Sequence, residues 1–291
     1  MITAHHSYFR IHVNSIWCVL LFSAPIALFS VISTSAAPLE YNPFASLRIE
    51  GQYGLLNGRS IFNRNTGRPV TQNEFDTDLG MDDSFVTWRM YASARPLEHH
   101  LLRVYGSLPQ HSKGVRILDR ELITGVNTYP VGTEVNSDLY VMSFGFGYDL
   151  DLLVGPRWYG GLNAEFLYMG ASMDITSKSN TRRDDTISIS EYVPCFGAHV
   201  ENRSLLPFLN PNERFQLGGF ARIIHSITPN YLNYIDVNAG LSVHMQFSPN
   251  FAVLAKAGVE RESVYHDQNV TNGNLLEFTR DGIFLSLSGS F

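Results

Sequence analysis

Three polar side chains in one segment are the residue types of a hydrolytic triad. Ser242, His244 and Asp236 could supply a nucleophile, a general base and an orienting carboxylate. They alternate with apolar residues, so all three would share one face of a strand. A polar strand face that is rich in such residues offers the same set by chance. We therefore assign no catalytic residue from it.

Charged residues recur at the positions that alternate with apolar ones in several other segments. Opposite charges on such faces can pair, because a buried charge without a partner carries a heavy desolvation cost. The set comprises Arg48, Glu50, Arg89, Arg103, Glu165, Glu191, Arg222, Asp236, Lys256 and Glu260. If these faces enclose one interior, they predict a largely plugged interior crossed by salt bridges. The alternative is a narrow, weakly selective pore.

Carboxylates also crowd residues 74–83. The group comprises Glu74, Asp76, Asp78, Asp82 and Asp83. Carboxylate oxygens can bind divalent cations, but this spacing is not that of a calcium-binding loop. The segment is expected to be a solvated acidic loop, and the sequence predicts neither a metal site nor a cofactor.

The elements that must position these residues show an alternation of period two. In residues 235–247, Ile235, Val237 and Leu241 face one way while Asp236, Asn238 and Ser242 face the other. A helix would scatter these polar residues around its circumference. About ten such segments follow one another, each near the 9 to 11 residues that cross a bilayer at a tilt. The predicted fold class is all-β, an antiparallel transmembrane β-barrel of about ten strands (8–12).

The N-terminal segment has the pattern of an export signal. Arg10 precedes an apolar run over residues 16–32, and small residues follow at positions 34–36. The predicted domains are therefore a signal peptide, 1–36, and one barrel domain, 37–291; an uncleaved anchor is the alternative. Cleavage would remove Cys18 and leave Cys195 without an intramolecular disulfide partner. The formal charge of -6 gives no basic footprint for nucleic acid.

The chain ends on a short alternating pattern that closes with an aromatic residue. Ile283, Leu285, Leu287 and Phe291 form its apolar face. This ending resembles the C-terminal signature of Gram-negative outer-membrane barrels. The resemblance implies an outer-membrane location, recognition of Phe291 by the barrel assembly machinery, and contact with membrane lipid and lipopolysaccharide. A soluble β-sandwich is disfavoured by this ending, by the export signal, and by aromatic residues near strand ends.

Two further resemblances bear on function. Residues 76–108 resemble a group of uncharacterised Gram-negative barrel proteins, which implies no activity. Asp76 and Asp78, with His266 and Asp267, are loosely similar to the catalytic pairs of the omptin surface proteases, although an adjacent His-Asp pair departs from the omptin Asp-x-His pattern. We expect a non-enzymatic barrel with a structural or surface role or a narrow pore. The alternative is an omptin-like or lipid-modifying surface hydrolase.

Overall fold

The computed structural model describes residues 44–63, 66–155, 158–178, 184–203, 205, 215–227, 232–248, 251–268 and 273–291. The predicted signal peptide lies outside these residues. No helix within them is long and apolar enough to cross a membrane.

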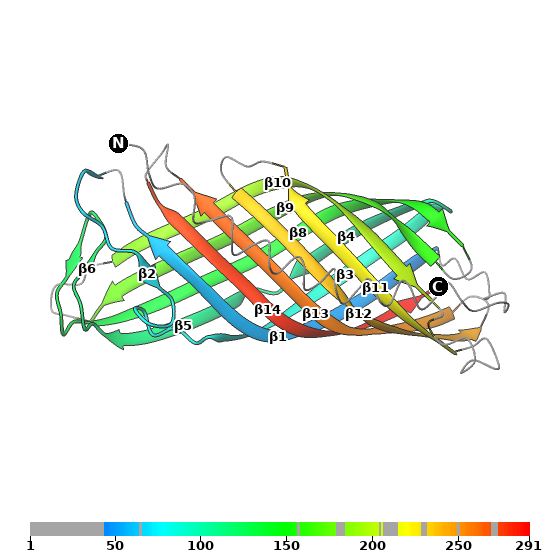
Figure 1. Ribbon diagram of the computed structural model, residues 1–291, viewed down its shortest axis with the longest axis horizontal. Helices are drawn as coiled ribbons and strands as arrows, with labels where there is room; N and C mark the ends of the chain where they lie inside the picture. Colours follow the sequence, from blue (N-terminus) through cyan, green and yellow to red (C-terminus); the bar gives the residue numbers. More distant parts are fainter. Residues whose placement is uncertain are drawn as a thin grey trace.

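The described residues form one closed antiparallel barrel whose wall contains ten strand positions (Figure 1). In order around the barrel these are β1 (Ala45–Ile61), β3 (Ser84–Leu97), β4 (His100–Ser107) continued by β5 (Gln110–Ile117), β8 (Glu134–Val154), β9 (Trp158–Ser177), β10 (Asp184–Asn202), β11 (Phe215–Ser226), β12 (Leu232–Ser248), β13 (Phe251–Asp267) and β14 (Leu275–Ser290). Two-residue strands β2 (Asn73–Glu74), β6 (Leu122–Ile123) and β7 (Thr128–Tyr129) lie in the connecting loops. The predicted fold class is confirmed.

The barrel closes where the last strand pairs with the first. The register of β14 with β1 runs from Ser46 opposite Ser290 to Ile61 opposite Leu275. Beyond it, Ala45 and Phe291 exchange two backbone hydrogen bonds of 2.9 Å. The C-terminal strand thus pairs with residues 47–53 of the first strand. In the hydrocarbon of a bilayer this closure satisfies the backbone groups of both edges.

The strands are longer than predicted. They contain up to 21 residues in β8 and 20 in β9, whereas the sequence pattern predicted 9 to 11. The prediction counted only the parts with outward apolar residues. The strands continue beyond those parts with the opposite polarity.

Strand β14 shows this inversion of polarity most clearly. Near its C-terminal end the outward side chains are apolar, and Ile283 and Leu285 are 61% and 69% exposed. Further from that end the outward residues are Glu277, Thr279 and Asp281, while the inward Leu276 and Phe278 are fully buried. The barrel is thus apolar outside in one half, as lipid requires, and apolar inside in the other.

An aromatic group on the outer face of β8, β9 and β10 marks the boundary between the halves. The rings of Phe144 and Tyr168 stack at 4.7 Å, and Tyr192 lies 5.0 Å from Tyr168 and 5.9 Å from Phe166, measured between ring centroids. Aromatic girdles of this kind lie at membrane interfaces. Outward residues beyond it on β10 are Ser190, Ser188 and Thr186.

The lengths of the connections orient the barrel. Connections at the end that holds Ala45 and Phe291 include the two-residue turn between β3 and β4, and those at the opposite end include the link from β1 to β3, residues 62–83. Outer-membrane barrels keep short turns in the periplasm and long loops outside. The half beyond the girdle is therefore an extracellular extension, and β9 rises roughly 20 Å above Tyr168 for a tilted strand.

The first loop, described at residues 62–63 and 66–83, folds into the extension. Its apolar residues Phe75 and Leu79 are 2% and 0% exposed. The loop reaches the inward faces of β1 and β5 at Gly58 and Gly114, where a Cβ atom would collide with the Phe75 ring and with the backbone of residues 79–81. Of the acidic cluster, Asp76, Asp82 and Asp83 are exposed. The loop is thus acidic outside, as predicted, and apolar inside, which was not predicted.

A matched pair of substitutions on β10 tests the inversion. Phe196→Arg places a cation in the lipid-facing half and is expected to lower the free energy of unfolding by about 2–4 kcal/mol. Ser188→Arg lies on the same outward face in the extension and is expected to change it by less than about 0.5 kcal/mol. Urea unfolding of both variants in lipid vesicles measures the difference. Equal losses would show that both positions face the same solvent.

Candidate functional site

The lumen is the enclosed site of the barrel, and its extracellular half is filled by apolar side chains. We call this cluster the apolar plug. It joins first-loop residues to the inward residues of the walls: Phe62, Phe75, Leu79 and Met81 with Leu139, Val141, Leu167, Met169, Met173, Ile175, Ile187, Ile189, Val193, Cys195, Ile224, Val264, Leu276 and Phe278, among others. All of them are at most 4% exposed. No prediction placed apolar residues inside the lumen.

Directly below the plug, buried ion pairs and a hydrogen bond connect β13 and β14 with strands across the lumen. Arg89 of β3 donates to Glu260 and, at 2.5 Å, to Glu262, both of β13. Arg280 of β14 donates to Glu262 and, at 2.8 Å, to Gln110 of β5. The four charged side chains are at most 6% exposed. Each buried charge therefore has an opposite charge in contact, as desolvation demands.

A second cluster of ion pairs is centred on Glu165 of β9. This carboxylate accepts hydrogen bonds from Arg103 of β4 and Arg222 of β11, and from the Tyr105 hydroxyl at 3.0 Å. Arg103 also donates to Asp149 at 3.0 Å. We call the two clusters together the charge ladder. It connects both sides of the wall across the lumen.

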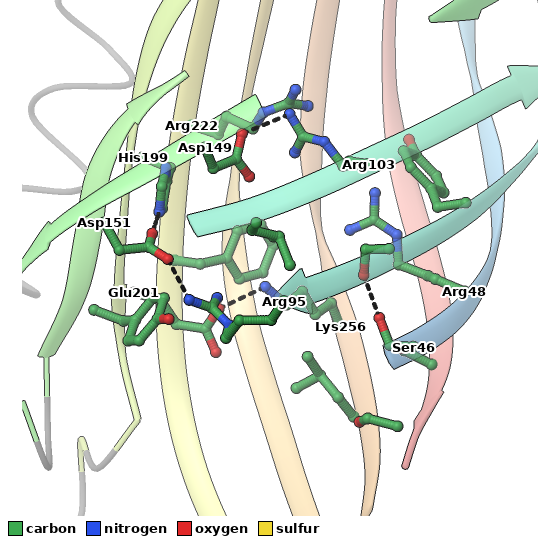
Figure 2. Close-up of a pocket in the computed structure, with 18 of the residues that line it drawn as sticks. Ser46, Arg48, Arg95, Arg103, Asp149, Asp151, His199, Glu201, Arg222 and Lys256 are labelled. Carbon is green, nitrogen blue, oxygen red and sulfur yellow. Dashed lines mark hydrogen bonds and ion pairs between the residues drawn. The ribbon is translucent and has the colours of Figure 1, made fainter. Parts of the chain in front are cut away.

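Below the ladder a cavity of about 230 Å³ lies at the periplasmic end. Asp151 accepts hydrogen bonds there from Arg95 at 2.6 Å and is 2.9 Å from His199 Nε2, while Lys256 donates to Glu201 at 2.7 Å (Figure 2). We call this cavity the vestibule. No pattern along the sequence indicated it.

The structure brings together nine of the ten charged residues predicted for the lumen. Arg48, Glu50 and Lys256 line the vestibule, and the rest apart from Glu191 form or contact the ladder. Glu191 is exposed instead. The pairing of β10 with β11 begins only at Cys195, so in the described residues no strand covers that side of β10 at Glu191.

Several lumen residues were missed by the prediction, although they continue its own period. Glu262 follows Glu260 by two residues on β13, and Arg280 lies on the inward face of β14 with Ser286. Asp149 and Asp151 share the inward face of β8. Extending each alternating segment by a few residues would have found them.

The structure does not assemble the two catalytic sets considered from the sequence. Asp236 and His244 lie on one strand face eight residues apart, which separates them by roughly 27 Å. Asp78 is engaged by Arg120 at 2.5 Å, and His266 is 1% exposed inside the wall. A base that solvent and substrate cannot reach does not suit a surface hydrolase. The described residues contain no group of His, Cys, Asp and Glu suited to hold a metal ion.

Comparisons with known proteins add similarity of fold only. No family model matches the chain, and no curated protein sequence does. Among solved structures, the outer-membrane protease OmpT of Escherichia coli is 15% identical, with a TM-score of 0.44 over 90% of this chain and 100% of that one. The Ail protein of Yersinia pestis is 9% identical, with a TM-score of 0.32 over 83% and 98%. At this level of similarity no activity is transferred to this chain.

Removing one cation from the ladder tests its role. Arg89→Met leaves Glu260 buried without its guanidinium and is expected to lower the free energy of unfolding by about 3–5 kcal/mol. Adding Glu260→Gln removes the stranded charge and is expected to recover part of that loss. Urea unfolding in vesicles measures both.

The control for this prediction is an exposed ion pair. Arg116 contacts Asp119 at 3.1 Å in the extension, and Arg116→Met is expected to cost less than about 1 kcal/mol. A loss in Arg89→Met no larger than in this control would mean that the ladder is hydrated and weakly coupled.

Proposed function

We propose that this outer-membrane β-barrel is a non-conducting, non-enzymatic protein that holds a rigid polar extension above the membrane. The observation that carries the proposal is the apolar plug, which fills the part of the lumen that an extracellular solute would have to enter. The protein then has a structural role or acts through surface contacts. The residues that carry this role lie on the outer face of the extension.

The lumen argues against the alternative of a narrow pore. A passage for ions needs continuous water or polar groups along its length. The plug residues Phe62, Leu167 and Phe278 are fully buried. Beneath them, Arg89 and Arg280 are held in contacts with carboxylates and an amide, so neither guanidinium is a mobile charge that faces an open channel.

The outer face of the extension supports a surface role. Polar residues cover it on β10 and β14, while β5 also exposes Val115 and Ile117, and ion pairs and hydrogen bonds hold neighbouring strands together there. Arg59 of β1 donates to Glu277 of β14 at 2.7 Å, and Ser263 of β13 contacts Thr279 at 3.2 Å. The extension is thus a continuation of the sheet rather than a set of separate loops.

Conductance across a planar bilayer tests the proposal. The purified barrel is expected to give a step-free trace at about 100 mV, because the plug excludes water. Replacing residues 66–80 by a short Gly-Ser linker removes Phe75 and Leu79 from the plug and is expected to produce resolved current steps.

The control for the conductance experiment keeps the plug and alters the surface. Val126 is 59% exposed in the extension, and Val126→Ala is expected to remain step-free. Current steps from the unaltered barrel would show that its lumen conducts ions, and would refute the non-conducting part of the proposal. Peptide or lipid cleavage by the purified barrel would refute the non-enzymatic part of the proposal.

A further inference from the structure

The vestibule carries more cationic than anionic side chains. Six Arg and Lys residues line it, against four carboxylates. Three of the cations are already matched: Arg95 by Asp151, Lys256 by Glu201, and Arg103 by Asp149. Arg222 is matched by Glu165, which lies behind the lining. Two guanidinium groups remain, those of Arg48 and Arg203.

Both guanidinium groups lie over aromatic rings, and within the described residues neither makes an ion pair shorter than 3.9 Å. Arg48 lies 3.5 Å from the centroid of the Tyr91 ring, and the nearest carboxylate contact recorded for it is Glu50 at 3.9 Å. Arg203 lies 4.7 Å from the centroid of the Tyr159 ring and has no ion pair among the described residues. Stacking on a ring leaves the N–H edge of a guanidinium available for a planar anion.

Three arginines of the vestibule lining also have a hydrogen-bond donor without an acceptor among the described residues. The Nε atoms of Arg48, Arg103 and Arg222 are buried and have no acceptor within the described part of the chain. All three are donors. Figure 2 shows Arg95 and Lys256 each in a dashed contact with a carboxylate, Asp151 and Glu201 respectively. Because these Nε atoms are buried, an anion in the cavity would be bound by terminal N–H groups of the guanidinium instead.

The rest of the lining defines the kind of molecule that fits. The rings of Phe220 and Phe284 lie 5.8 Å apart between centroids, and Leu101 and Leu254 also line the cavity. A volume of about 230 Å³ accommodates a small molecule and excludes a folded partner. Pockets that combine apolar walls with a few convergent polar groups are typical of small-ligand sites.

We propose that the vestibule binds a small organic anion from the periplasm, by a carboxylate or phosphate group held by Arg48 and Arg203 and an apolar part held against Phe220 and Phe284. The plug and ladder close the lumen above this site, so the anion enters and leaves at the periplasmic end. Anion binding in the vestibule does not require the barrel to be non-conducting. The conductance experiment therefore tests the proposed function without testing this site.

Calorimetric titration of the detergent-solubilised barrel at constant ionic strength tests the proposal. The probes are benzoate and phenyl phosphate, with benzylamine as a cation of similar size and inorganic phosphate as an anion without an apolar part. Both aromatic anions are expected to bind at one site, inorganic phosphate about tenfold more weakly, and benzylamine not at all. Binding of benzylamine as tight as that of benzoate, or no binding of either aromatic anion, would overturn the proposal.

Substitutions locate the site. Arg48→Gln and Arg203→Gln are each expected to weaken binding of phenyl phosphate about tenfold, the loss of one charge-assisted contact. Arg48→Lys keeps the charge but loses the planar fork, and an intermediate loss is expected. Lys113→Gln is the matched control, because it changes the net charge equally on the outside of β5, where the Lys113 side chain is 71% exposed.

The variants also separate a specific site from a general effect of charge. Heat-modifiable migration on a gel shows that each variant is folded before titration. If both folded Gln variants bind the probes as tightly as Lys113→Gln does, the vestibule holds only water and the proposal is wrong.

Discussion

The structure depends on one constraint: in the hydrocarbon of a bilayer a strand has no water to pair its backbone, so every strand needs a neighbour on both sides. The seam between β1 and β14 meets this requirement along 16 residue pairs. Closure then fixes which side chains face outward, because successive residues alternate between the two faces. The outward set is apolar where lipid surrounds the barrel and polar where water does. Strands such as β10 and β14 change their pattern between the two halves.

The same constraint explains why the lumen is divided. Inside the lipid-facing half the inward residues are polar, and their charges lie far from bulk water. They are retained as pairs, such as Arg89 with Glu262 and Arg222 with Glu165, since a single buried charge would be costly. In the extension the inward residues are apolar and need a hydrophobic partner instead. The first loop provides it, with Phe75 and Leu79 packed inside.

Alternation along the chain was enough to predict the strands and the inward position of residues such as Arg103 and Glu260, because each is set by parity along one strand. The plug could not be predicted from the sequence, because the apolar side chains of residues 62–81 occur in a segment whose polarity indicates a solvent-exposed loop. Nor was Glu191 correctly placed, since its exposure depends on where β11 begins to pair with β10. The vestibule depends on which charges find partners across the lumen, and no local pattern encodes that.

Labelling of Cys195 tests most directly whether the lumen is dry at the base of the apolar plug. This thiol faces inward from β10 within the plug and is 1% exposed, and the predicted removal of the signal peptide takes away the other cysteine. A charged, membrane-impermeant maleimide added to the folded barrel is predicted to leave Cys195 unmodified over hours and to react fully once the barrel is boiled in detergent. Complete labelling of the folded barrel within minutes would show that water fills the lumen, and would contradict a dry, plugged interior.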